Sequence, residues 1–112
     1  MTTKTIRVLA AFGLVAATAI IPAFADQTGM AGIHDLRREG GRLCMSDHWH
    51  YGSGNGPSKN AAIRDAVGSW SSFTAMEYGS DWASWGRSAS RGQDCSRDSS
   101  GYSCSISARP CR

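Results

Sequence analysis

Residues 58–79, SKNAAIRDAVGSWSSFTAMEYG, decide the fold of this chain. Apolar residues recur here three or four positions apart, which places them along one side of an α-helix. Ser58 can cap the first turn through its hydroxyl oxygen, and Gly79 can end the helix in a left-handed conformation. We therefore predict an amphipathic helix that ends near Tyr78 and buries a stripe made of Ile63, Ala66, Val67, Trp70 and Phe73.

The chain after this helix predicts a β-hairpin. Apolar and polar residues alternate over 102–109, which is the period of a half-buried strand. The segment DSSG at 98–101 supplies turn chemistry, and a partner strand is expected at about residues 88–97. If the turn is tight, Cys95 lies directly opposite Cys104, whereas a left-handed bulge at the turn glycine would shift the register and separate them.

The chain before the helix predicts one further strand over residues 43–51. The segment GSGNGP at 52–57 is expected to be a loop, because its glycines and proline continue neither a strand nor a helix well. The predicted fold class is α+β, with a small three-stranded antiparallel sheet in the order strand, helix, strand, strand and the long helix packed on it. The large apolar residues of the first strand fall on odd positions and would share its buried face: Leu43, Met45, Trp49 and Tyr51.

The first 25 residues have the pattern of a secretory signal peptide. Two basic residues precede an apolar run that is too short to span a bilayer, and AFA at 23–25 fits a signal-peptidase site. We predict cleavage after Ala25, no membrane span in the mature chain, and export to the periplasm or the extracellular medium. Residues 26–41 are predicted to form a flexible leader with one helical turn at 33–38, so that the folded domain covers residues 42–112.

Export changes the charge balance of the chain. The twelve basic residues less Lys4 and Arg7 of the signal peptide leave ten, against nine acidic ones. These ten are spread along residues 37–112 rather than clustered. A nucleic acid is therefore an unsupported partner, because its recognition needs a dense basic patch.

Four cysteines in a short mature chain predict two disulfides. A domain of this size buries a small core and usually needs covalent support outside the cytoplasm. No Cys-x-x-Cys pair is present, which argues against structural zinc. Because Cys104 lies on the apolar face of its strand, while Cys44 and Cys111 both lie on the opposite face of theirs, we predict the pairs Cys44–Cys111 and Cys95–Cys104.

Two motifs before and at the start of the helix could carry chemistry. His48 and His50 would share one face of the predicted strand and could bind a metal ion with Asp47, although a solvated polar face is the simpler interpretation. Lys59 and the backbone N–H groups that follow the glycines at 52–56 could hold an anion. A plain strand-to-helix connection explains these glycines more simply, because they match neither the Walker nor the dinucleotide pattern.

The leading functional hypothesis is an exported binding or structural protein without a cofactor. The chain contains no G-x-S-x-G elbow, and the sequence favours a non-enzymatic role. Trp82 and Trp85 could form an exposed aromatic surface beside Tyr78 for an envelope protein or a glycan. The alternative is a metal-binding protein or metal-dependent enzyme built on His48 and His50.

Overall fold

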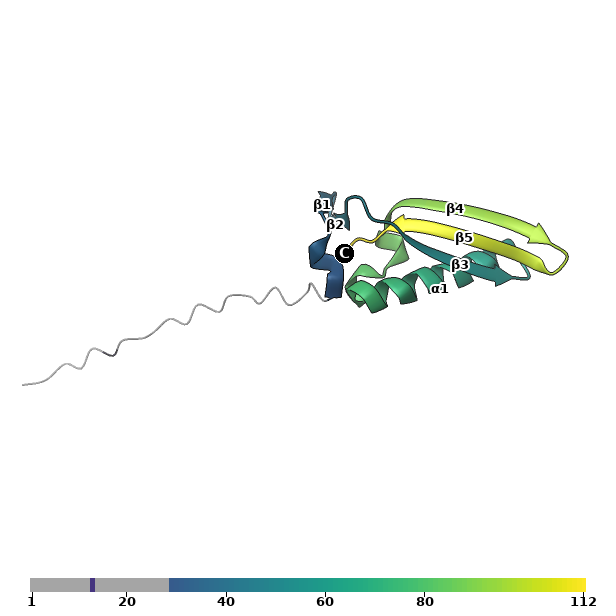
Figure 1. Ribbon diagram of the computed structural model, residues 1–112, viewed down its shortest axis with the longest axis horizontal. Coiled ribbons are helices and arrows are strands. Elements are labelled where there is room, and N and C mark those ends of the chain that lie inside the picture. Colours follow the sequence, from purple (N-terminus) through teal and green to yellow (C-terminus); the bar gives the residue numbers. More distant parts are fainter. Residues whose placement is uncertain (1–12, 14–28) are drawn as a thin grey trace, which may run out of the picture.

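The computed structural model describes Gly13 and residues 29–112. Apart from Gly13, the predicted signal peptide and its cleavage site lie outside these residues. Within residues 29–112, no helix is both long and apolar enough to cross a bilayer. The elements are η1 (Gly29–Ile33), β1 (Leu36–Glu39), β2 (Arg42–Met45), β3 (His50–Gly56), α1 (Lys59–Tyr78), η2 (Ser80–Trp82), η3 (Trp85–Arg87), β4 (Ala89–Asp98) and β5 (Gly101–Arg109), as Figure 1 shows.

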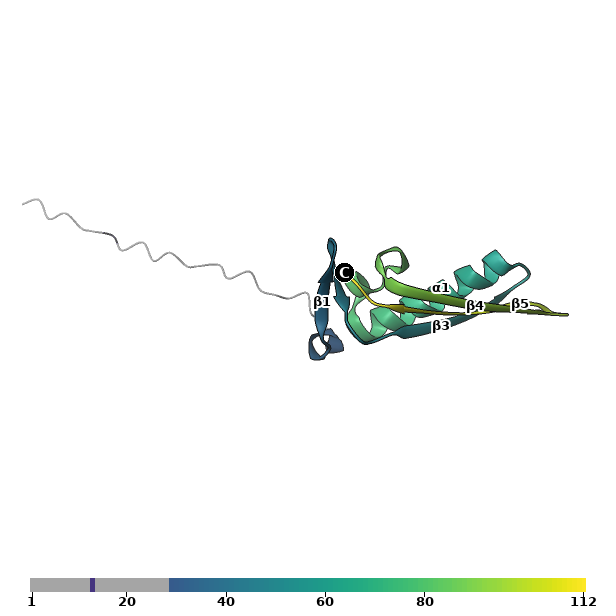
Figure 2. The ribbon, with the colours of Figure 1, turned by 90° about the horizontal axis from the view of Figure 1, so that it is seen from above.

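The fold is α+β, as the sequence predicts. Strands β3, β5 and β4 form an antiparallel sheet in that spatial order, and α1 connects β3 to β4 and packs against β3 and β5. A second sheet consists of the β1–β2 hairpin alone. Figures 1 and 2 show that this hairpin lies at one end of the larger sheet, beside the C-terminal segment.

The helix prediction is confirmed at both ends, whereas its buried face is only partly as predicted. Ser58 Oγ accepts a hydrogen bond from the Ala61 N–H at 3.1 Å, and Gly79 ends the helix at φ 98°. Phe73, predicted to be buried, is 45% exposed. The buried residues instead follow a four-residue spacing along one narrow line: Ala62, Ala66, Trp70, Thr74 and Tyr78.

The predicted strand over 43–51 is wrong in extent and in orientation. The chain forms two strands, β2 and β3, and leaves the strand conformation between them. In β3 the even positions face the helix, so His50 is buried and Tyr51 is 71% exposed. The prediction of a loop is wrong, since residues 52–56 form most of β3. Its glycines have no side chain, and the helix can therefore pack directly on the strand backbone. A Cβ atom added at Gly54 would lie 2.2 Å from the Ala66 backbone nitrogen.

The predicted hairpin and both predicted disulfides are confirmed. β4 and β5 pair in the register that places Asp98 opposite Gly101, so Cys95 faces Cys104. Gly101 has φ 135°, but it does not shift the register. Disulfides join Cys95 to Cys104 and Cys44 to Cys111.

The segment predicted as a leader carries regular structure from Gly29 onward. It contains η1 and β1, and the helical turn predicted at 33–38 is wrong, because residues 36–39 form a strand that pairs with β2. The C-terminal segment extends this pairing. Leu43 and Arg112 exchange two backbone hydrogen bonds of 2.9 Å on one side of the Cys44–Cys111 pair, and the Met45 N–H donates to the Pro110 carbonyl at 3.0 Å on the other side.

An ion pair between the buried Arg109 and the partly buried Glu39 joins this hairpin to the larger sheet. The Arg109 guanidinium at the end of β5 donates to both carboxylate oxygens of Glu39 at 2.6 Å and to the Met45 carbonyl at 2.6 Å. Arg109 is 4% exposed. Charge-assisted bonds in this forked geometry are strong, so they place β1 firmly against β5.

Candidate functional site

The aromatic surface predicted after the helix does not form. Tyr78 and Trp82 are fully buried, and they pack in one core cluster with Ala31 and Met45. Trp85 is half-buried, with its ring edge against Trp70. Because Tyr78 and Trp82 contribute no exposed ring, these residues stabilise the contact between η1, β2 and the end of α1.

Lys59 lies where the sequence predicts it, exposed as the first residue of α1. The glycines before it belong to β3 and pack against the helix backbone instead of forming a free loop. These glycines therefore do not form the free loop that anion binding beside Lys59 would require.

The structure places His48 and His50 differently from the expected strand pair. His48 lies in the segment between β2 and β3, and His50 begins β3 with its side chain buried. Among the residues that the structure describes, no group of three His, Cys, Asp or Glu side chains is placed to hold a metal ion. The geometry therefore does not favour the metal-site alternative.

The two histidines instead join a cluster with His34, which the sequence placed in the leader. The imidazoles of His34 and His48 stack with their centroids 4.3 Å apart, and His48 meets His50 edge-on at 5.1 Å. His34 Nε2 lies 2.9 Å from the Tyr78 hydroxyl, and His50 Nε2 lies 3.1 Å from Glu77 Oε2. The three histidines thus meet at the C-terminal end of α1.

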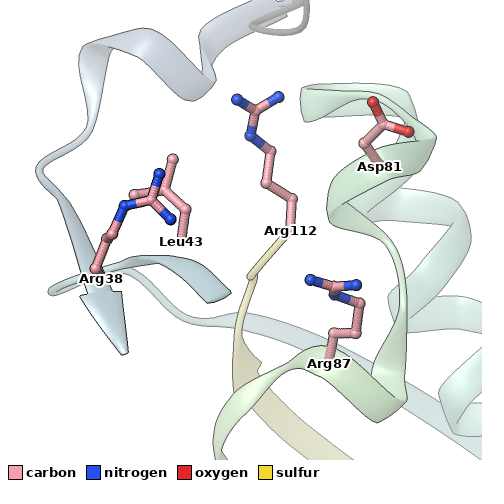
Figure 3. Close-up of a pocket in the computed structure, with 5 residues that line it drawn as sticks. All are labelled: Arg38, Leu43, Asp81, Arg87 and Arg112. Atoms are coloured by element: carbon pink, nitrogen blue, oxygen red, sulfur yellow. The ribbon is translucent and has the colours of Figure 1, made fainter. Parts of the chain in front are cut away.

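An arginine-lined pocket beside the β1–β2 hairpin is the candidate binding site. Its cavity of about 400 Å³ is lined by Arg38, Leu43, Asp81, Arg87 and Arg112. Figure 3 shows Arg38, Arg87 and Arg112 arranged around one space, with the Asp81 carboxylate at its edge. Each arginine comes from a different segment: β1, η3 and the residues after β5.

Several contacts hold the walls of this arginine pocket in place. The Arg42 guanidinium donates to the carbonyl oxygens of Arg87 and Ser88 at 2.9 and 3.0 Å, which ties η3 to β2. The Arg112 guanidinium lies over the Trp82 ring at 5.6 Å. The Cys44–Cys111 disulfide connects β2 to the segment that carries Arg112. These contacts connect the segments that carry Arg87 and Arg112 to β2.

Two of the pocket's guanidinium groups face solvent. Arg38 and Arg87 are exposed, and within residues 29–112 neither guanidinium has a hydrogen-bond or ion-pair partner. The lining thus holds three positive side chains against the single carboxylate of Asp81. Such a site attracts a negative group and offers it several N–H donors.

Sequence reasoning missed this pocket because its arginines are far apart in the chain. One signal was present: the predicted Cys44–Cys111 bridge already places Arg112 beside β2. Arg38 and Arg87 had no such signal, because β1 was not predicted and because no pattern in the sequence shows that η3 lies beside β2.

Comparisons with protein-family models, with curated proteins and with solved structures found no match.

Proposed function

We propose that this chain is an exported binding protein that holds a negatively charged group of an envelope macromolecule in the arginine pocket. The observation that carries the proposal is the convergence of Arg38, Arg87 and Arg112 from three segments on one cavity. The two disulfides support export, because such bonds persist in oxidising compartments.

The size and chemistry of the cavity support a small anionic group as the part that is bound. Its volume of about 400 Å³ falls within the range of about 300–1,000 Å³ that ligand pockets occupy. Guanidinium groups present planar pairs of N–H donors that match a carboxylate, a sulfate or a phosphate. Since the pocket walls are held by Arg42 and the Cys44–Cys111 disulfide, little ordering is needed when the ligand binds.

An acidic glycan fits this lining best. The exposed guanidinium groups of Arg38 and Arg87 can bind a sugar carboxylate, while the Asp81 carboxylate can accept hydrogen bonds from sugar hydroxyls. A purely acidic peptide makes poorer use of Asp81, because its side chains would bring a like charge to that carboxylate. We therefore propose that the ligand is a uronic acid unit of a glycan and not an acidic protein segment.

The test is calorimetric titration of the oxidised protein with an oligomer of galacturonic acid, a neutral oligomer of glucose and a polyglutamate peptide. We expect binding of the galacturonic acid oligomer, and a loss of at least tenfold in affinity in the double variant Arg38→Ala/Arg87→Ala, which is about 1.4 kcal/mol. Affinity should also fall as salt rises, because the contacts are ionic.

The matched control is Arg64→Ala/Arg97→Ala. This variant removes the same charge from two exposed arginines that do not line the pocket. Equal losses in both double variants would show that net charge alone drives binding, and would contradict the proposal. Absence of binding of the galacturonic acid oligomer together with binding of polyglutamate would assign the pocket to an acidic protein instead.

A further inference from the structure

A second site lies apart from the arginine pocket, at the C-terminal end of α1. There the side chain of His34, which directly follows η1, meets those of His48 and His50, which lie just before β3 and at its start. The His50 ring also stacks on Tyr78 at 4.7 Å. Together with Glu77 and Tyr78 of α1, these three residues form what we name the histidine cluster.

The buried His50 ring lies between Thr74 and Glu77 of α1. It is 2% exposed, and its Nδ1 lies 2.9 Å from Thr74 Oγ1 while its Nε2 lies 3.1 Å from Glu77 Oε2. The Thr74 hydroxyl donates to the Trp70 carbonyl at 2.7 Å, so its oxygen accepts a hydrogen bond from His50 Nδ1. Protonation of His50 then adds a second ring hydrogen on Nε2, which faces the Glu77 carboxylate at 3.1 Å.

His34 is connected to the same network through Tyr78. The Tyr78 hydroxyl lies 2.9 Å from His34 Nε2 and also forms a hydrogen bond with Glu77. Burial raises the pKa of Tyr78 to about 12, so its hydroxyl keeps its hydrogen across the physiological range. With that hydrogen given to Glu77, the Tyr78 oxygen accepts from His34. This contact joins the residue that follows η1 to the end of the helix.

The cluster has little negative charge with which to balance three charged imidazoles. Within residues 29–112, Glu77 is the carboxylate in direct contact with the cluster, whereas Asp35 and Asp47 are exposed and line a cavity of about 240 Å³ together with His34 and His48. Water screens these two exposed groups. Stacked rings at 4.3 Å repel when both are charged, so protonation opposes the contact between His34 and His48.

The direction of the pKa shifts agrees with this geometry. Burial lowers the pKa of His48 below its ordinary 6.5, and the neighbouring His34 lowers it further against the opposing effect of Glu77. Burial likewise lowers the pKa of His50. A histidine whose pKa is lowered on folding stabilises the closed form above pH 6.5, and this contribution is lost as the pH falls below that value.

We propose that the histidine cluster is an acid-operated latch, which holds η1 and the start of β1 against the end of α1 near neutral pH and releases them in mild acid. The segment that opens is residues 29–36, because it has neither a disulfide nor the Arg109–Glu39 ion pair to retain it. Residues 42–45 stay in place through the Cys44–Cys111 bridge. The histidine cluster shares no residue with the lining of the arginine pocket.

The test is amide hydrogen exchange of the oxidised protein at pH 7.5 and at pH 5.0, corrected for the intrinsic exchange rate at each pH. We expect protection of residues 29–36 to fall at least tenfold at pH 5.0, while protection in β5 changes less than twofold. His48→Gln removes the central charge and keeps a polar side chain of similar reach. We expect this variant to reduce the pH effect to less than threefold.

The variant Tyr78→Phe distinguishes the effect of histidine protonation from the effect of the hydrogen bond between Tyr78 and His34. This variant loses the hydroxyl contact with His34 at every pH, so protection of residues 29–36 falls at pH 7.5 while its pH dependence remains. Equal protection at both pH values in the unmodified chain would overturn the proposal. An unchanged pH response in His48→Gln, or a midpoint below pH 4.5 that points to a carboxylate, would also overturn it.

Discussion

Gly54 brings a strand backbone and a helix backbone into direct contact. A Cβ atom at this position would lie 2.2 Å from the Ala66 nitrogen and 2.5 Å from the Ala62 oxygen, both of them backbone atoms that cannot turn aside. The helix contributes its smallest apolar residues at the same place. A single hydrogen atom at Gly54 therefore sets the distance between the two layers of the domain.

We expect Gly54→Ala to destabilise the protein by about 3 kcal/mol, because overpacking forces the helix away from the sheet. The matched control is Gly68→Ala on the exposed side of α1, where an added Cβ meets no atom within 4 Å. That change should stabilise the protein by about 0.8 kcal/mol through helix propensity. Urea denaturation measures both, and similar effects of the two substitutions would contradict this account of the packing.

At the scale of elements, the β1–β2 hairpin depends on distant parts of the chain. Its own pairing covers four residues on each strand, which is too short for independent stability. Three contacts supply the rest: the Cys44–Cys111 bridge, the pairing of Leu43 with Arg112, and the Arg109–Glu39 ion pair. All three lead to β5 or to the residues after it.

We expect Glu39→Gln to cost on the order of 3 kcal/mol at pH 7, because it leaves the buried Arg109 charge without its partner. The hydrogen bond from Arg109 lowers the pKa of Glu39 below its ordinary 4.5, so this carboxylate stabilises the fold above that pH and loses the effect as the pH falls below it. Urea denaturation at pH 7 and pH 3 should therefore show the variant and the unmodified chain converging in acid. A difference at pH 3 as large as that at pH 7 would contradict the role of this ion pair.

At the scale of the whole molecule, the two disulfides close loops of very different length. Cys44 and Cys111 are 67 residues apart, whereas Cys95 and Cys104 are 9 apart and already neighbours in a hairpin. The longer bridge therefore removes more freedom from the unfolded chain.

We expect the Cys44→Ser/Cys111→Ser variant to lose about 4 kcal/mol and the Cys95→Ser/Cys104→Ser variant about 2.5 kcal/mol, from loop entropy. Thermal and urea denaturation of the two double variants provide the comparison. The result would contradict this ranking if removal of the hairpin bridge cost as much as removal of the long one.

Part of the candidate sites follows from the sequence, and the rest does not. The bridge between Cys44 and Cys111 was predicted from strand parity, and it places Arg112 beside β2. The meeting of His34 with His48 was not predicted, because a Gly-rich composition hid η1 and β1. Trp82 is buried although the sequence predicts it on the surface, because no local pattern shows that Ala31 of η1 and Met45 of β2 join it in one core cluster.

The sequence by itself determined the helix 59–78 with its two caps, the β4–β5 hairpin and both disulfide pairs. These features depend on contacts between near neighbours, or on alternation along one strand. Only the tertiary structure decided which face of α1 is buried, that the glycines of β3 form a strand, and where the arginines and histidines meet. The physical reason is that glycine has no side chain to reveal a packed face, and that the two clusters form only when segments far apart in the chain lie together.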